Sequence, residues 1–305
     1  MYIRMAFVAA LMGMVAAATP RPASAGSIGY VLGNGGTTLH AFHTDTPGTA
    51  TTIVLGGAVN SLDDIDFRPL TGQLYGYVDS SDEYVIIDVK TGNTTLASSS
   101  PVVPTNTSRL GIDFNPTIDR ARVVTELETN IVFNPNDGST TLVNDLFYVA
   151  GDPNEGANPQ VVANGYTNSL LGIMSDSTVQ YVLDSDLDIL AILGNNAGTL
   201  TTVGSLGVDF TEDAGLDIFF DPSTGTNMAF ALLNTVNSNN SALYTIDLTT
   251  GAATLVGDFG SEFGTITGLA VTPVPEPSTL AMLAIGAVAP GVMILRRRRR
   301  RESAT

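Results

Sequence analysis

The sequence predicts an all-β fold, a β-propeller of five four-stranded blades closed by pairing of its N- and C-terminal strands. Three observations predict it: strand units that recur along the chain, a spacing near 50 residues between matching units, and an incomplete unit at each end of the body. A repeat of this length with four strands per period is typical of propeller blades.

The first recurring unit is a strand, a tight turn that contains glycine, and a second strand. Apolar and polar residues alternate along the strands, and the turn glycine can adopt a positive φ. Copies of this hairpin lie at 38–55, 84–96, 130–142 and 242–257.

The second recurring unit begins with a strand that carries an aspartate at a fixed place. Its copies start at Asp64, Gly111 and Gly215, and a looser unit occupies 161–204. The matching residues Asp66 and Asp113 are 47 residues apart, and Asp217 follows after a further 104, about two units. A last copy, 268–271, has no second strand.

The two chain ends complete one blade together, which removes open sheet edges. This organisation predicts blades at 62–98, 110–143, 161–204 and 214–257, and a composite blade of 266–272 with 27–55. An open array of strands, or two β-sandwich modules, is the alternative.

The N-terminal 1–25 has the pattern of a secretory signal peptide. Arg4 supplies a positive charge, an uncharged apolar run spans 5–18, and Ala23-Ser24-Ala25 is a small-residue cleavage site. The body is therefore expected to start at Gly26. An uncleaved membrane anchor is the alternative.

The C-terminal segment has three parts in fixed order. Pro275-Glu276-Pro277 lies in a linker over 273–279, an uncharged apolar stretch spans 280–295, and six arginines, Arg296, Arg297, Arg298 and the next three, open a tail over 296–305. Sixteen apolar residues form about 24 Å of helix, close to the span of a membrane. Positive charge stays on the cytoplasmic side, so we expect a transmembrane helix with the body in the periplasm.

This tail resembles the PEP-CTERM sorting signal of Gram-negative bacteria. The resemblance implies recognition by a membrane enzyme, an exosortase, which processes the chain and passes it outward to the cell surface or the extracellular space. It also implies a setting in which exopolysaccharide and biofilm matrix are made.

The body, 26–272, is strongly acidic and free of cysteine. It contains five Lys and Arg against 28 Asp and Glu, a net charge near −23. Nucleic acids and anionic lipids need a basic surface, so the composition argues against them as partners.

The body also resembles an exported bacterial family known only as a domain of unknown function. The matching segments are 111–124, 151–159 and 166–169. This resemblance implies a propeller-like architecture and brings no activity with it.

Three aspartates are the leading candidates for a ligand or ion site. Asp66, Asp113 and Asp217 occupy the same place in the first strands of three units, and the innermost strands of a propeller line its channel. Converging carboxylates raise one another's pKa or recruit a cation, and oxygen ligands suit Ca²⁺. The alternative is that each caps a turn or pairs with a backbone amide in its own blade. Ala270 at the matching place in the composite blade breaks the ring.

Other acidic groups are weaker candidates. The polar segment 151–159 offers Asp152 and Glu155 as ligands or as parts of a structural loop. Asp184, Asp186 and Asp188 have part of a calcium-loop spacing but lack its glycine and glutamate, which favours a solvated turn.

Few basic groups are available for a site. Arg109, Arg120 and Arg122 either pair with Asp113 and Asp119 or hold an anionic sugar. His40 and His43, an odd number of residues apart on one strand, should point to opposite faces, which argues against a paired metal site.

These observations favour a non-enzymatic surface or matrix protein that binds a glycan or another surface protein, with Ca²⁺ as the candidate ion. No metalloprotease, nucleophile-elbow or phosphate-loop motif occurs in the sequence. A carbohydrate or lactone hydrolase that uses channel carboxylates is the alternative, because two acids suffice for that chemistry.

Overall fold

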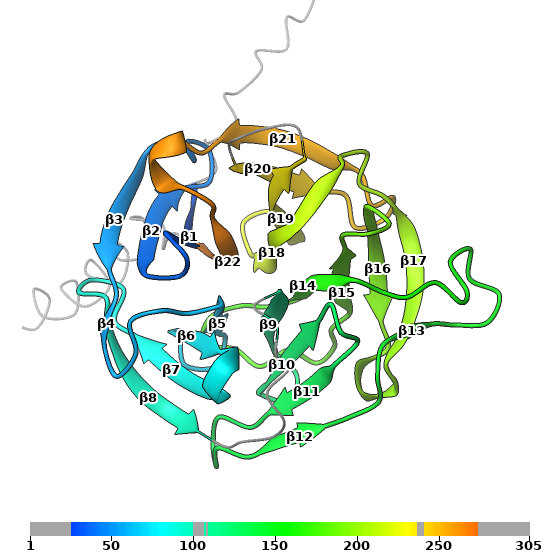
Figure 1. Ribbon diagram of the computed structural model, residues 1–305, viewed down its shortest axis with the longest axis horizontal. Helices are drawn as coiled ribbons and strands as arrows, with labels where there is room; N and C mark the ends of the chain where they lie inside the picture. The colour runs from blue at the N-terminus through cyan, green and yellow to red at the C-terminus, as the bar shows by residue number, and fades with distance from the viewer. Residues whose placement is uncertain (1–25, 100–106, 108, 237–240, 274–305) are drawn as a thin grey trace, which may run out of the picture.

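Five β-sheets surround a central channel in the computed structural model (Figure 1). The structure describes residues 26–99, 107, 109–236 and 241–273. The expected signal peptide, the Pro-Glu-Pro motif, the transmembrane helix and the arginine run lie outside these residues. Within the described ranges, no helix is long and apolar enough to cross a membrane.

The strands follow one another from the channel outward in each blade. Blade 1 contains β5 (Asp64–Arg68), β6 (Gln73–Val78), β7 (Glu83–Ile87) and β8 (Asn93–Ser99). Blade 2 contains β9 (Leu110–Asn115), β10 (Arg120–Thr125), β11 (Asn130–Phe133) and β12 (Thr140–Leu142). Blade 3 contains β14 (Val161–Tyr166), β15 (Gln180–Asp184), β16 (Ile189–Leu193) and β17 (Thr199–Ser205). Blade 4 contains β18 (Phe210–Asp221), β19 (Thr226–Thr235), β20 (Ser241–Ile246) and β21 (Ala253–Asp258).

The closing blade joins the two ends of the body. Its order is β22 (Thr267–Pro273), β1 (Ser27–Gly33), β2 (Thr38–His43) and β3 (Ala50–Val54). β1 and β22 are antiparallel, with Gly29 opposite Val271. The prediction of five blades closed by the terminal strands is confirmed, and the open array and the sandwich modules are wrong.

Two short strands that sequence reasoning did not anticipate connect neighbouring blades. β4 (Gly56–Gly57) leaves the closing blade and pairs in parallel with β8, and β13 (Phe147–Tyr148) leaves blade 2 and pairs in parallel with β17. Each therefore covers the outer edge of the following blade. The remaining elements are single 3₁₀ turns, η1 (Asp79–Ser81), η2 (Asn195–Ala197) and η3 (Ser261–Phe263).

The hydrophobic core is divided among the five interfaces between consecutive blades. Each interface holds one cluster of buried side chains; between blades 1 and 2, for example, the rings of Tyr75 and Phe114 meet edge-on. Phe42 of the closing blade packs edge-on against Phe259, 4.9 Å away, where the ring closes. Because an isolated blade would expose both its faces, burial of these clusters favours the closed ring.

The innermost strands run in the same direction and approach closely. A Cβ built on Gly111 of β9 would lie 2.5 Å from the Cα of Ala163 in β14, so only glycine fits there. The Asp64 carboxylate of β5 accepts a hydrogen bond from the Ile112 amide of β9, and two residues further along both strands Asp66 accepts one from Phe114. Side chains at matching positions of neighbouring innermost strands therefore lie close together in the channel.

Candidate metal centre

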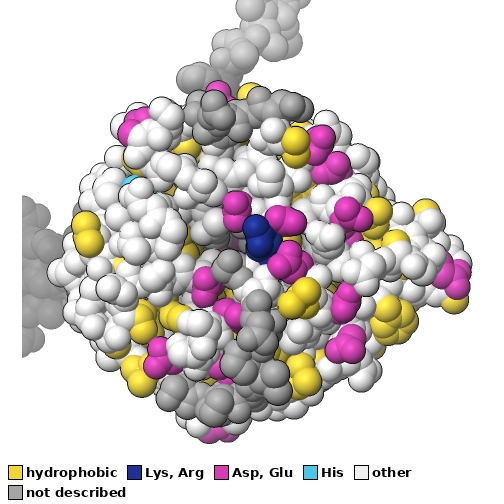
Figure 2. Space-filling model, in the orientation of Figure 1, with side chains coloured by type: hydrophobic (Ala, Val, Ile, Leu, Met, Phe, Trp, Pro, Cys, Tyr) yellow, Lys and Arg dark blue, Asp and Glu magenta, His cyan; other side chains and the backbone are white. Residues whose placement is uncertain are grey.

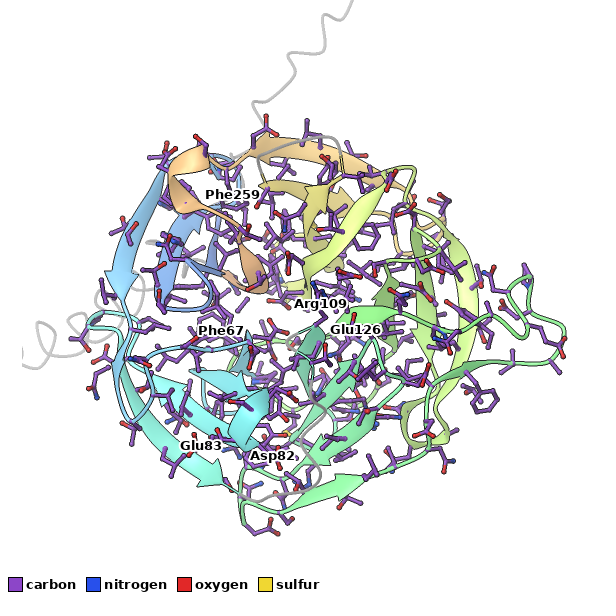
Figure 3. All side chains as sticks on the ribbon, viewed as in Figure 1. Phe67, Asp82, Glu83, Arg109, Glu126 and Phe259 are labelled. Carbon is purple, nitrogen blue, oxygen red and sulfur yellow. The ribbon has the colours of Figure 1, made fainter. Side chains whose placement is uncertain are left out.

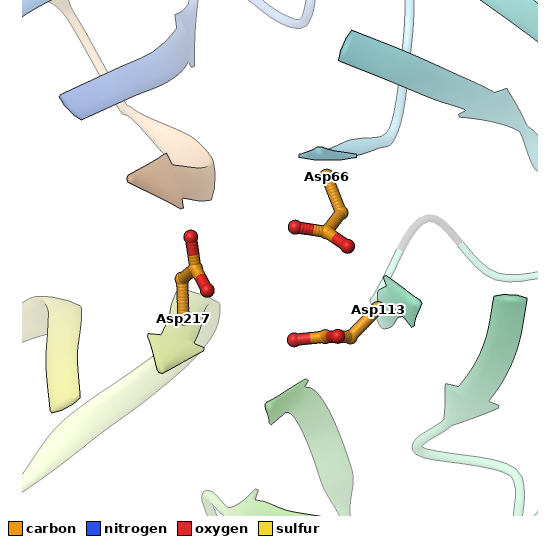
Figure 4. Close-up of side chains that lie close together, drawn as sticks. All are labelled: Asp66, Asp113 and Asp217. Carbon is orange, nitrogen blue, oxygen red and sulfur yellow. The ribbon is translucent and has the colours of Figure 1, made fainter. Parts of the chain in front are cut away.

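Three carboxylates meet in the middle of the channel. Asp66 lies on β5, Asp113 on β9 and Asp217 on β18, at matching places in their blades (Figure 4). One carboxylate oxygen from each lies within 4.8 Å of the others. The three residues are buried, with 4%, 2% and 4% of their surfaces exposed.

Each carboxylate also ties its blade to the next one. Asp66 Oδ2 accepts a hydrogen bond of 2.8 Å from the backbone N–H of Phe114, and Asp113 Oδ2 one of 3.2 Å from that of Tyr166. Asp217 Oδ2 accepts one from the Val271 N–H. Asp66 and Asp217 also accept hydrogen bonds from the amides of Phe67 and Ile218 in their own strands, so the expected pairing within a blade is present for these two. The innermost strands lie so close that an amide of the next blade is within hydrogen-bond distance as well.

The other two blades place small residues at the same position. Asp66 binds the amide of Phe114, the residue directly after its counterpart Asp113 in the next blade. By the same rule, the amides of Tyr166 and Val271 identify Gly165 in β14 and Ala270 in β22 as the counterparts in the other two blades. The ring of five thus carries three carboxylates and two positions without a polar side chain. A divalent cation held here would take its protein ligands from the three acidic blades.

Asp64 is a fourth buried carboxylate that sequence reasoning missed. It lies two residues before Asp66 and therefore points to the same side of β5. Its oxygens accept hydrogen bonds from the amides of Ile65 at 2.8 Å and Ile112 at 2.7 Å. The sequence did contain a signal for it: side chains two residues apart on a strand point to the same face, so Asp64 shares the channel face with Asp66.

Burial raises the pKa of every carboxyl group in this cluster. For Asp66, burial and then the neighbouring Asp217 charge hold the pKa well above its usual range. For Asp113, burial and then the charges of Asp66 and Asp217 do the same. Burial raises the pKa of Asp217 to about 7, against the opposing effect of the Val271 and Ile218 amides. Three negative charges at this separation need protons or a cation.

A small cavity adjoins the carboxylates. Its volume is about 10 Å³, room for one water or one ion. Asp66 and Asp217 line it together with Ser169, Leu171 and Pro273. The cavity places open space directly beside two of the three carboxylates.

Both ends of the channel are covered. At one end the loop 167–179 extends from blade 3 and reaches three other blades: Gly172 N–H donates to Pro69 O, Ser175 N–H to Pro116 O, and Phe220 N–H to Ser169 O. At the other end Arg109 lies near the middle of the ring (Figure 3), where Figure 2 shows basic side-chain atoms among acidic ones.

The sequence led us to expect that Arg109 pairs with Asp113. It pairs instead with Glu212, on the other side of the channel. Its Nε lies 2.8 Å from Glu212 Oε2 without the alignment of a hydrogen bond, so the contact is an ion pair. The backbone oxygen of Arg109 accepts a hydrogen bond from Glu126 N–H. The side chains of Arg109 and Glu126 lie beside the innermost strands (Figure 3).

The other two arginines also have partners different from the expected ones. Arg122 is buried and donates to Tyr166 Oη, Asn130 Oδ1 and Asn196 Oδ1. Arg120 donates to the backbone oxygens of Ile118 and Asp119. Side-chain pairing of Asp119 is with Arg68 instead. These contacts tie the two arginines to neighbouring blades and turns, and among the described residues they leave no basic side chain bonded to the three channel carboxylates.

The remaining predicted acidic groups do not join the centre. Asp152 accepts hydrogen bonds from the N–H and hydroxyl of Thr202, which fix the segment 151–159 to β17 of blade 3. Glu155 accepts one from Gly151 N–H, within the segment itself. Asp184 is buried and accepts hydrogen bonds from Tyr148 Oη and three amides, so the expected solvated turn is wrong at its first residue.

The histidines lie away from the channel cluster and on opposite faces of β2. His40 is buried between the hydroxyls of Thr38 and Thr52, each 3.0 Å away, and burial lowers its pKa. His43 is exposed.

Comparison with known proteins identifies both the body and the tail. A family profile described as a domain of unknown function, DUF4394, matches residues 38–270, and one described as the PEP-CTERM protein-sorting motif matches residues 273–300. The second match marks the chain as an exported protein that an exosortase handles at the membrane. No curated protein matches the sequence.

Solved structures are similar at low sequence identity. A chain of a nidogen/laminin complex is 12% identical with a TM-score of 0.47, covering 81% of this chain and 98% of that one. Hydrazine synthase of Kuenenia stuttgartiensis is 15% identical with a TM-score of 0.40, covering 67% and 53%. A protein of unknown function from Bacteroides caccae is 11% identical with a TM-score of 0.40, covering 82% and 100%.

Proposed function

The chain belongs to the DUF4394 family, and we propose that it is a non-enzymatic, surface-displayed binding propeller whose channel holds a calcium ion. The observation that carries this proposal is the convergence of Asp66, Asp113 and Asp217, whose oxygens lie within 4.8 Å of one another. An ion there would join blades 1, 2 and 4 directly. Its role is to stabilise the closed ring that presents the outer surfaces to a partner.

The charge of the cluster supports a cation rather than an empty channel. The neighbouring groups that contact these carboxylates are backbone amides, and Asp64 adds a further acid. Carboxylate oxygens are the ligands Ca²⁺ prefers, and extracellular calcium modules work at millimolar concentration. Calcium at the cell surface would replace the protons that burial otherwise forces on these groups.

The geometry favours binding over hydrolysis. A pKa of about 7 would suit Asp217 to acid–base chemistry. However, a glycan or lactone would have to reach carboxylates that are at most 4% exposed, past the loop 167–179 or past the Arg109–Glu212 pair. A hydrolase acting here predicts turnover of a glycoside or lactone that disappears in Asp113→Asn.

Calcium binding is tested by calorimetry and thermal denaturation of the purified protein near pH 8. A concentration 100 times the dissociation constant should stabilise the fold by about 2.7 kcal/mol, which is roughly 5–10 °C for a domain of this size. Binding should also release protons, visible as a heat that depends on the ionisation enthalpy of the buffer. Magnesium serves as the comparison ion.

Asp113→Asn is the decisive variant, because its amide oxygen still accepts the Tyr166 N–H while one anionic ligand is lost. Asp186→Asn, on an exposed turn, is the matched control. Loss of the calcium effect in the first variant alone supports the centre. Equal calcium stabilisation of both variants, or no stabilisation of the native chain by millimolar calcium, would sink it.

The partner is proposed from the sorting signal rather than from the channel. A chain displayed outside the cell meets exopolysaccharide and other surface proteins, and either fits an acidic, calcium-binding scaffold. Retention of the protein by exopolysaccharide of its own host, with calcium and with a chelator, tests the first. No retention under either condition would leave a protein partner as the candidate.

A further inference from the structure

Exposed apolar side chains gather at one end of the channel. Leu171, Ile173 and Met174 belong to the loop 167–179, and Leu70 and Ile118 to the turns after β5 and β9. The loop is fixed to both turns, through Gly172 to Pro69 and Ser175 to Pro116. We call these five residues, Leu70, Ile118, Leu171, Ile173 and Met174, the channel-end patch.

The patch is more than scattered surface residues. Four of its members are at least 40% exposed. A hollow of about 290 Å³ beside it has an apolar part, Leu170, Ile173, Met174 and Phe220, and a polar part, Asn168, Ser175, Asp176 and Ser177. Exposed apolar side chains with a polar rim are typical of a site of contact with a protein or a membrane.

The C-terminal tail leaves the propeller at this same end. The innermost strands are parallel, so β22 ends where the turns after β5 and β9 lie. Pro273, its last residue, lines the small channel cavity together with Leu171 and Ser169. Only six residues, 274–279, separate Pro273 from Leu280, where the apolar stretch of the sorting signal begins, so Leu280 lies seven residue steps along the chain. Seven extended residues reach at most about 25 Å.

We propose that the channel-end patch is a membrane-docking surface, which rests on the outer leaflet of the bilayer that holds the tail before processing. The short tether keeps this end of the propeller near the bilayer, and Ile173 and Met174 are placed to enter the interface. Apolar side chains on a surface loop bind there by burying area among the headgroups. Docking would fix the orientation of the body and hold the Pro-Glu-Pro motif at the membrane surface.

Charge selects the kind of lipid. The same end carries exposed carboxylates on the turns between third and fourth strands, at Asp88, Asp137 and Asp247, against one exposed amine on these turns, Lys90, and the loop itself adds the exposed Asp176. These surround the patch at larger radius and repel an anionic surface. The expected occupant is therefore a zwitterionic bilayer, and anionic lipid should weaken the contact.

The absence of cysteine makes a direct test possible. The protein with its tail is inserted into phosphatidylcholine vesicles, recovered by flotation, and labelled with an environment-sensitive fluorophore at Ile173→Cys, Ile118→Cys or Leu255→Cys. Leu255, on the outer strand β21, is the matched control, since it is 54% exposed and Ile173 and Ile118 are each 53% exposed. All three labels share one tether.

Docking predicts a shift to shorter wavelength and several-fold stronger quenching by spin-labelled lipid at positions 173 and 118 than at 255. Replacing Ile173 and Met174 by aspartate should abolish the quenching of the label at 118, whereas Leu255→Asp should not. Equal quenching at all three positions would overturn the proposal. A response that is unchanged in vesicles rich in phosphatidylglycerol would also overturn it. A shift that appears in detergent and grows with protein concentration would overturn it as well, because it would indicate that a second copy of the chain covers the patch. The outcome does not depend on calcium in the channel.

Discussion

Arg68 of blade 1 and Asp119 of blade 2 form a buried ion pair at the channel end of the interface between these blades. The Arg68 Nε donates to Asp119 Oδ1 at 2.7 Å, and Nη2 donates to Oδ2. Asn136 contributes to both partners, as acceptor for Arg68 and as donor to Asp119. The pair therefore joins the end of β5 to the turn between β9 and β10.

Neutralising Asp119 should destabilise the protein strongly. Asp119→Asn is the suitable change because φ is 54° at this residue, a conformation that asparagine tolerates. It leaves the Arg68 charge buried without a counter-ion, which costs about 3–5 kcal/mol. Urea unfolding measures the loss. Glu212→Gln, which breaks the half-exposed pair with Arg109, is the control and should cost at most about 1 kcal/mol. Similar losses in the two variants would contradict this account.

Acid should weaken the same interface. Burial by itself raises the pKa of Asp119, but hydrogen bonds from Arg68 and Asn136 outweigh it and hold the pKa below its usual range. A depressed pKa in the folded state means that this contribution is complete above the unfolded value and disappears as the pH falls through the folded value. In Asp119→Asn the loss of stability below about pH 4 should be shallower than in the native protein.

The channel carboxylates predict the opposite dependence on pH. Burial raises their pKa values, and that of Asp217 reaches about 7. The folded state then binds more protons than the unfolded state between about pH 4 and that value, so stability falls as the pH rises through this window. With a chelator present, the melting temperature should decline from pH 5 to pH 8.

Calcium should remove this decline if it binds the cluster, since the ion replaces the protons. The calcium-dependent rise in melting temperature is therefore expected to be small at pH 5 and largest at pH 8. Asp217→Asn should flatten both curves, while its amide oxygen keeps the hydrogen bond from Val271. A calcium effect that is the same at pH 5 and pH 8 would place the ion elsewhere.

The blades could be predicted from sequence because their signals are local. Alternating strands and turn glycines such as Gly92 and Gly251 specify each hairpin within a few residues. The matching aspartates supplied the period, and the incomplete units at 27–55 and 266–272 supplied the closure.

The contacts between blades could not be predicted, because they depend on which segments meet in space. Nothing near Asp119 in the sequence points to Arg68, 51 residues earlier. The parallel strands β4 and β13 are two residues long, too short to give a periodic signal. The convergence of Asp66, Asp113 and Asp217 was reachable from the repeat, whereas the identity of the amides they bind required the separation between strands.

That separation itself can be tested at Gly111. A Cβ at this position would lie 2.5 Å from both Ala163 Cα and Asn164 N, which are backbone atoms of the next blade and cannot turn aside. Gly111→Ala should therefore force β9 and β14 apart and cost several times the roughly 1 kcal/mol of an ordinary substitution. It should also disturb the nearby hydrogen bond from Tyr166 to Asp113, and with it any calcium effect.

Gly56→Ala is the control, because no atom lies within 4 Å of its added Cβ and its φ is not positive. Thermal denaturation with and without calcium distinguishes the two variants, and a Gly111→Ala protein as stable as Gly56→Ala would show that the innermost strands have room to spare.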